Sequence, residues 1–118
     1  MHAAIKIRKE GVGDPKKALE AAFRGHQSLK HAVVVDEDID VGDPERVEWA
    51  IATRAQMDQD LTLFSNQFGS SLDPSADQVS RRTCKAGLDA TIPLGASRAT
   101  FARAKIPGAD GLNVDDYL

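Results

Sequence analysis

The 118 residues suffice for one domain with a single hydrophobic core, and 42% of them are hydrophobic and 28% charged, as in ordinary soluble proteins. The mild net charge of −3 excludes binding to nucleic acid or to an anionic membrane through bulk electrostatics, because such binding needs a clustered basic surplus. The single Cys84 excludes an intramolecular disulfide, and the sequence has neither an apolar run of about 18 residues nor a signal-peptide pattern, so a cytoplasmic location is expected.

The first predicted unit is a strand followed by a helix. Residues 3–8 alternate between apolar and charged side chains, which is typical of a strand with one face toward water. Asp14 offers an N-cap, Pro15 fits the first helical position, and Gly25 is suited to end the helix. The apolar positions expected to face the core are Ala18, Leu19, Ala22 and Phe23.

The second predicted unit repeats this order. Residues 31–36 contain three consecutive valines, which indicates a strand buried on both faces, as in a parallel sheet covered by helices. Asp43 and Pro44 predict the next helix start, and residues 61–64 form a third apolar run. Strands and helices alternating at a spacing of roughly 30 residues predict a βαβαβ arrangement with parallel strands and right-handed crossovers.

The rest of the chain, after residue 64, has weaker signals. Residues 65–78 are predicted to form a long loop that is functional, mobile or covered by a partner, and residues 83–91 a further short strand before a turn at 93–95. Residues 108–118 are expected to be a peripheral tail. The predicted fold is therefore one small α/β domain over residues 1–118. Its mainly parallel sheet is built from βαβαβ plus C-terminal strand and loop segments, with the helices packing on the sheet.

Four sequence blocks, in order, resemble the C-terminal part of the UbiD-like decarboxylases. They are HAAIKIRK at 2–9, KHAVVVDEDIDV with DPE and VEWAIATR over 30–54, GSSLDPS at 69–75 and KAGLDATIPLG at 85–95. The resemblance implies an α/β domain that mediates oligomer contacts in carboxy-lyases acting on aromatic or α,β-unsaturated acids. It also implies that prenylated FMN, a divalent metal and a Glu-Arg-Glu triad belong to an N-terminal flavin-binding domain, for which these residues offer no matching segment.

The resemblance leads to two hypotheses. In the first, the chain is a small non-catalytic subunit or stand-alone C-terminal domain that assembles with a flavin-binding large subunit, with itself, or with both. Prenylated FMN and the divalent metal are then expected in the partner and not in this chain. In the second, the chain is a free-standing binding or regulatory module derived from that domain. The residues expected at an interface or beside a substrate are Trp49, Arg54, Ser70, Ser71, Asp73, Asp89 and Thr91.

Other chemical motifs fail on spacing. The acidic run at 36–43 resembles a calcium loop, but Val41 and Val47 stand where an EF-hand needs Gly and Glu. An exposed loop whose last Asp caps a helix is favoured, although contacts also gather at the carboxyl ends of strands. Residues 11–13 lack the third glycine of a dinucleotide fingerprint.

Three single residues were open to a functional and a structural interpretation. Cys84 has no histidine at an informative spacing to act as a base, and is therefore expected to pack within its strand. His31 is expected to be a hydrogen-bonded residue at a strand edge rather than a metal ligand. Trp49 lies at a different angle from Val47 and Ile51, so both core packing and a role at an interface remain open.

Overall fold

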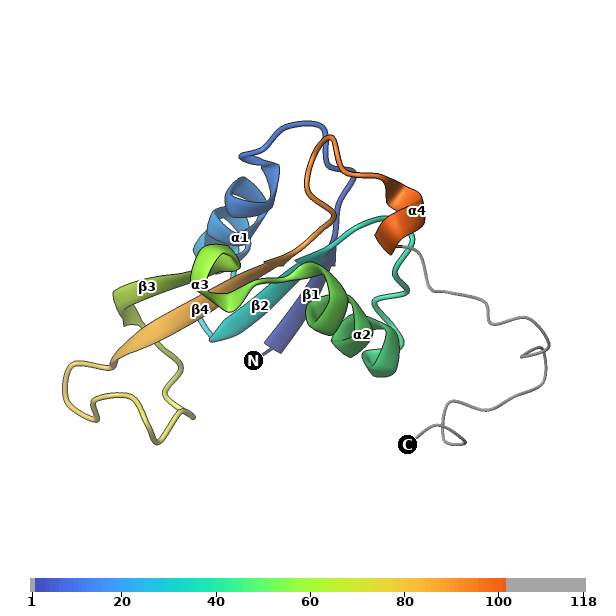
Figure 1. The fold of residues 1–118 in the computed structure, drawn as a ribbon. Coiled ribbons are helices and arrows are strands. Elements are labelled where there is room, and N and C mark those ends of the chain that lie inside the picture. Colours follow the sequence, from blue (N-terminus) through green and yellow to red (C-terminus); the bar gives the residue numbers. More distant parts are fainter. Residues whose placement is uncertain (1, 102–118) are drawn as a thin grey trace.

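The computed structural model describes residues 2–101, which form a four-stranded sheet with helices on both faces (Figure 1). The elements in chain order are β1 (His2–Lys6), α1 (Asp14–Gly25), β2 (His31–Val35), α2 (Pro44–Arg54), α3 (Met57–Asp60), β3 (Leu61–Phe68), β4 (Arg82–Ala90) and α4 (Arg98–Phe101). Within this described part, no helix is long and apolar enough to cross a membrane. The predicted tail at 108–118 lies outside the described residues.

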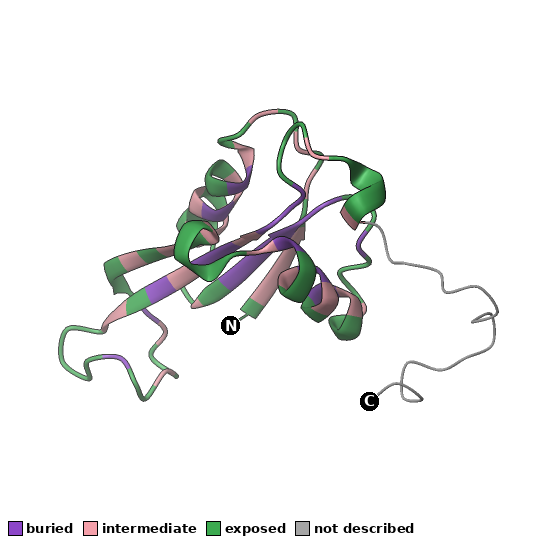
Figure 2. Ribbon diagram, viewed as in Figure 1, coloured by how far each residue is buried: buried purple, intermediate pink, exposed green. Residues whose placement is uncertain are grey.

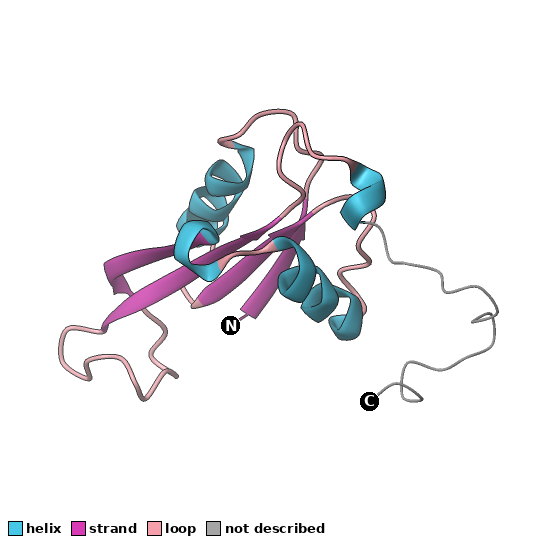
Figure 3. Cartoon of the chain, in the orientation of Figure 1, coloured by secondary structure: helices cyan, strands magenta, loops and turns pink. Residues whose placement is uncertain are grey.

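The sheet is mixed, with strand order β1-β2-β4-β3. β1, β2 and β4 are parallel, whereas β3 runs antiparallel to β4 at one edge (Figure 3). The α/β fold with a mainly parallel sheet is thus confirmed, but the third parallel strand is β4 and not the apolar run at 61–64. The physical reason is that a loop without a crossover helix joins β3 to β4, and strands connected in this way pair antiparallel.

β2 is buried on both faces, as its consecutive valines predict. Val33 and Val35 belong to the core cluster on the α2 side, and Ala32 and Val34 to the cluster on the α1 side with Leu19. This alternation of side chains between the two faces places α1 and α2 on opposite sides of the sheet. The buried band along β2 and β4 is the central layer of the molecule (Figure 2).

The two helix starts differ. At α2, Asp43 is the N-cap, and its carboxylate accepts a hydrogen bond from the Glu45 N–H at 3.1 Å, as predicted. At α1 the prediction is wrong by one residue, because Gly13 is the N-cap. The Asp14 carboxylate instead accepts hydrogen bonds from the Glu10 and Gly11 N–H groups, at 2.9 and 2.8 Å, and closes the preceding loop.

The loop before β4 lies later in the chain than the predicted range of 65–78. β3 continues to Phe68, so residues 69–81 form the loop. A β-bulge between Phe64 and Gln67, with Asn66 at a φ of 55°, disrupts the end of β3. β4 confirms the strand predicted at 83–91, and the following turn includes Gly95, whose φ is 83°.

Candidate functional site

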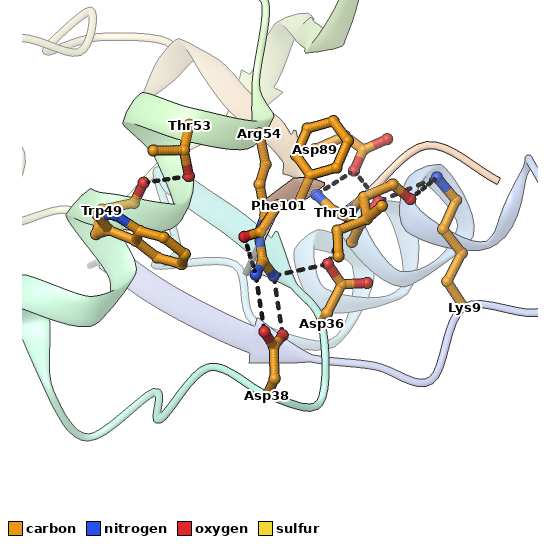
Figure 4. A network of polar contacts seen from close by, with 10 residues as sticks. Lys9, Asp36, Asp38, Trp49, Thr53, Arg54, Asp89, Thr91 and Phe101 are labelled. Atoms are coloured by element: carbon orange, nitrogen blue, oxygen red, sulfur yellow. Dashed lines mark hydrogen bonds and ion pairs between the residues drawn. The ribbon is translucent and has the colours of Figure 1, made fainter. Parts of the chain in front are cut away.

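The carboxyl ends of β1, β2 and β4 meet at one edge of the sheet, where contacts are expected in open α/β folds. Lys9 follows β1, Asp36 follows β2 and Thr91 follows β4. Arg54, at the end of α2, points into the same region (Figure 4). Polar side chains from four separate segments therefore converge here.

Arg54 is the centre of this network, and its side chain is fully buried. Its Nη1 donates to Asp36 Oδ2 at 3.0 Å and to Asp38 Oδ1 at 2.8 Å. Its Nη2 donates to Asp38 Oδ2 at 2.7 Å and to the Phe101 carbonyl oxygen at 3.1 Å (Figure 4). One guanidinium thus ties α2 to the loop after β2 and to α4.

The ion pair between Arg54 and Asp38 favours the charged form of each residue. Hydrogen bonds from the Arg54 guanidinium hold the pKa of Asp38 below its usual value, and the Asp38 carboxylate raises the pKa of Arg54. Asp36 is 2% exposed and also accepts a hydrogen bond from the Ile92 N–H at 2.8 Å. A buried carboxylate is stable here because a cation and a backbone donor both contact it.

Trp49 lies next to Arg54 on α2. It is half-buried against the core cluster on the α2 side, and the Arg54 guanidinium carbon is 5.2 Å from the centre of its ring. At this distance the cation contacts the aromatic face. Core packing therefore accounts for only part of the Trp49 side chain, which stays half-exposed.

Asp89 and Thr91 lie at the same edge and contact each other. The Thr91 N–H and Oγ1 both donate to Asp89 Oδ1, at 2.9 and 2.5 Å. Lys9 Nζ donates to Thr91 Oγ1 at 3.1 Å and to the Ile92 carbonyl oxygen at 3.3 Å (Figure 4). Sequence reasoning missed Lys9, although a charged residue shortly after a strand that ends at this edge was a usable signal.

Ser70, Ser71 and Asp73 lie in a different place, because the loop at 69–81 precedes β4 and so lies at the amino ends of the parallel strands. Asp73 Oδ2 forms an ion pair with Lys30 Nζ at 2.8 Å, and the Ser75 N–H donates to Asp73 Oδ1 at 2.9 Å. Lys30 and Ser75 together lower the pKa of Asp73 to about 2. The seven predicted residues thus form two groups at opposite ends of the parallel strands. One group is Trp49, Arg54, Asp89 and Thr91 at the carboxyl ends, and the other is Ser70, Ser71 and Asp73 at the amino ends.

Two hollows in the described part lack the features of a flavin site. The pocket between Lys30, Lys85 and the 69–75 segment measures 230 Å³, below the roughly 300–1,000 Å³ of small-molecule sites. A hollow of 640 Å³ along α1 is lined mainly by Ala, Ile and Leu, with no Lys or Arg to meet a phosphate. Residues 2–101 also contain no group of three or more His, Cys, Asp or Glu placed to hold a metal ion. These residues do not fit the flavin or the metal of the family.

Two single-residue predictions have different outcomes. Cys84 is exposed, so the prediction that it packs in its strand is wrong; its Sγ lies 3.8 Å from the Ser65 hydroxyl near the edge of the sheet. The predicted hydrogen bond of His31 is present, because its Nδ1 is 2.6 Å from Nδ1 of His2, but its strand β2 lies inside the sheet and not at its edge. Partial desolvation of its ring and the neighbouring His2 lower the pKa of His31.

The family model of the 3-octaprenyl-4-hydroxybenzoate carboxy-lyase C-terminal domain, UbiD_C, matches residues 1–90. The chain belongs to the UbiD C-terminal domain family. Anhydromevalonate phosphate decarboxylase from Methanocaldococcus jannaschii is 51% identical over 107 residues, which cover 91% of this chain and 25% of that protein. Its counterpart from Aeropyrum pernix is 54% identical over 108 residues, which cover 92% and 24%. The chain thus spans about a quarter of the length of these relatives.

Solved structures agree with this membership. The UbiD-class enzyme HmfF from Pelotomaculum thermopropionicum, in complex with FMN, matches 99% of this UbiD domain with a TM-score of 0.82 and 44% identity, over 26% of its own chain. The 3,4-dihydroxybenzoic acid decarboxylase AroY from Klebsiella pneumoniae matches 95% with a TM-score of 0.79 and 26% identity, over 26% of its chain. The resemblance seen in the four sequence blocks is therefore confirmed.

Proposed function

We propose that this UbiD domain is a non-catalytic subunit that docks on a flavin-binding polypeptide and completes a decarboxylase. The observation that supports the proposal is the match to the UbiD C-terminal domain family, which covers only about a quarter of relatives such as HmfF, an enzyme solved in complex with FMN. Prenylated FMN, the divalent metal and the catalytic carboxylates belong to the flavin-binding polypeptide in this account.

The polar residues at the carboxyl ends of the parallel strands, with Trp49 beside them, are called the carboxyl-end network: Lys9, Asp36, Asp38, Trp49, Arg54, Asp89 and Thr91. These residues have different roles in the proposed assembly. Arg54 and Thr91 are buried, so they position the segments around them. Trp49 and Asp89 are half-buried and offer surface to a partner or a substrate. In the second group, Ser71 is exposed, and Lys30 fixes Asp73, which shapes the loop at 69–81 as a separate contact surface.

Anhydromevalonate phosphate is the proposed substrate of the completed enzyme. Relatives with 50–54% identity to this chain carry the name of that activity, whereas the gallate decarboxylase of Lactiplantibacillus plantarum is 35% identical. The domain at hand would contribute to this specificity only through the residues it places beside the flavin-binding polypeptide.

Co-expression with a flavin-binding UbiD-like polypeptide from the same genome tests the proposal. We expect the two chains to co-purify with flavin absorbance and to release CO₂ from anhydromevalonate phosphate, with gallate as the contrasting substrate. Each chain alone is expected to be inactive. Separate elution, with no change in the activity of the flavin-binding polypeptide, would favour the alternative of a free-standing binding module.

A further inference from the structure

Lys85, in β4, is a buried cation without a carboxylate partner. Only 2% of the residue is exposed. Its Nζ donates a hydrogen bond of 2.6 Å to the carbonyl oxygen of Gln27, in the turn after α1. None of the ion pairs among residues 2–101 includes Lys85. A lysine ammonium has three N–H donors, and lysine is almost never fully buried unless it is paired, so the missing counter-charge needs an explanation.

The other neighbours of this ammonium are apolar. Lys85 and Gly87 point to the same face of the sheet, where Gly87 lies against Leu19 of α1. The centre of the Phe23 ring, on the same helix, is 5.8 Å from Lys85 Nζ. Burial lowers the pKa of Lys85, because it removes water from the charged form. An anion beside the ammonium would offset this cost.

A pocket of 230 Å³ lies beside Lys85, which forms part of its lining, and is called the Lys85 pocket. Leu29 and Leu72 contribute apolar walls. Lys30 and Asp73 also line the pocket, but their ion pair of 2.8 Å makes them neutral together. The charge of Lys85 is therefore the one that the pocket offers to a ligand.

We propose that the Lys85 pocket binds a small monocarboxylic acid, whose carboxylate pairs with the Lys85 ammonium and whose short apolar chain lies against Leu29 and Leu72. The carboxylate accepts the N–H groups that the Gln27 carbonyl leaves free. The volume lies below the roughly 300–1,000 Å³ of sites for drug-sized ligands, so the pocket suits a short acid. The single negative charge of the ligand matches the single unpaired cation.

Inorganic phosphate suits this pocket less well. Its charge and its several oxygens are commonly met by Arg side chains or by several donors at once. The described residues that line the pocket include no Arg, and Lys30 is already held by Asp73 and by the Ser75 hydroxyl. The apolar walls offer a phosphate no further donors.

Titration of the full chain with short acids tests the inference. Backbone amide shifts are followed by NMR at constant ionic strength with formate, acetate, propionate, butyrate, butyramide and inorganic phosphate. We expect saturable shifts at Lys85 and Leu29, with butyrate binding at least about tenfold tighter than formate, because its chain covers the apolar walls. Butyramide has a similar shape without the charge and is expected to bind at least about tenfold more weakly than butyrate. The measurement uses this chain alone, so its outcome does not depend on the flavin-binding polypeptide.

Lys85→Met removes the cation and keeps an unbranched side chain. It is expected to stay folded, because an uncompensated buried charge is lost, and to bind butyrate at least about tenfold more weakly than the wild type. Lys16→Met, at an exposed position of α1, is the matched control and is expected to bind butyrate as the wild type does.

Four results would overturn the inference: no saturable binding of any of the acids, equal binding of butyrate and butyramide, tighter binding of phosphate than of butyrate, or unchanged butyrate binding by Lys85→Met. If Lys85→Met does not fold, the comparison of butyrate with butyramide on the wild-type chain decides.

Discussion

Arg54 joins more segments than any other side chain in the carboxyl-end network. It contacts Asp36 and Asp38 after β2 and the backbone of Phe101 in α4, and its Nε has no hydrogen-bond partner within the described residues. A buried ion pair of this kind adds little net stability compared with apolar packing, but losing one partner is costly. Its main effect is to fix the relative positions of the segments.

Replacing Arg54 with Met should lower the free energy of unfolding by about 3–5 kcal/mol, because Asp36 stays buried without a counter-charge. Urea unfolding measures the change. Arg46→Met, on the same helix, is the control, with an expected loss below about 1 kcal/mol. Equal losses in the two variants would show that the buried ion pair does not matter for stability.

The ion pair between Asp73 and Lys30 should make the stability depend on pH. The pKa of Asp73 falls from 3.8 to about 2 in the folded state, so the unfolded chain binds the proton more readily. The ion pair stabilises the fold fully at pH values above 3.8, the pKa of Asp73 in the unfolded chain, and this stabilisation is lost as the pH falls through about 2. Urea unfolding between these pH values should show a shallower pH dependence for Asp73→Asn than for the wild type, and no such change for Glu48→Gln on exposed α2 surface.

At the scale of elements, α1 and β4 approach each other closely at Gly87. A Cβ atom built there would lie 2.8 Å from Cδ1 of Leu19, which is itself 1% exposed and has little room to move. Glycine is thus needed in the middle of a buried strand so that the helix can pack on it. This contact sets the distance between the α1 layer and the sheet.

Gly87→Ala should therefore destabilise the domain by about 1–3 kcal/mol through overpacking. Combining it with Leu19→Ala should cost less than the sum of the two single changes, because the shortened side chain leaves room for the new methyl group. Thermal and urea unfolding of the four proteins in this cycle measure the coupling. Strict additivity would mean that the two positions do not compete for space.

The sequence determined the βα units well, because their signals are local. The valine run of β2 and the Asp43-Pro44 start of α2 each act within a few residues. The orientation of β3 was not predictable in this way, since alternation indicates a strand but not its partner. The one-residue error at α1 arose because the Asp14 carboxylate binds loop N–H groups instead of capping the helix.

The candidate site was predictable only in part. The family resemblance picked out Arg54, Asp89 and Thr91, which the structure places at one edge of the sheet. The contacts of Arg54 with Asp36 and of Lys9 with Thr91 join residues 18 and 82 positions apart, and no local pattern encodes such pairs. Burial of Arg54 was likewise unexpected, because a charged helix end usually faces solvent.

At the scale of the whole molecule, the two groups of predicted residues lie at opposite ends of the parallel strands, and β3 is an edge strand of the sheet (Figure 1). The two groups therefore offer separate surfaces to a flavin-binding polypeptide in the proposed assembly.

Sedimentation velocity, followed in the visible absorption of the flavin, tests the docking of this domain most directly. A flavin-binding UbiD-like polypeptide from the same genome is run alone and with an excess of this chain, which lacks visible absorption of its own in this account. We predict that the flavin boundary moves faster when the chain is added. A flavin boundary that sediments at the same rate with and without the chain would contradict the account.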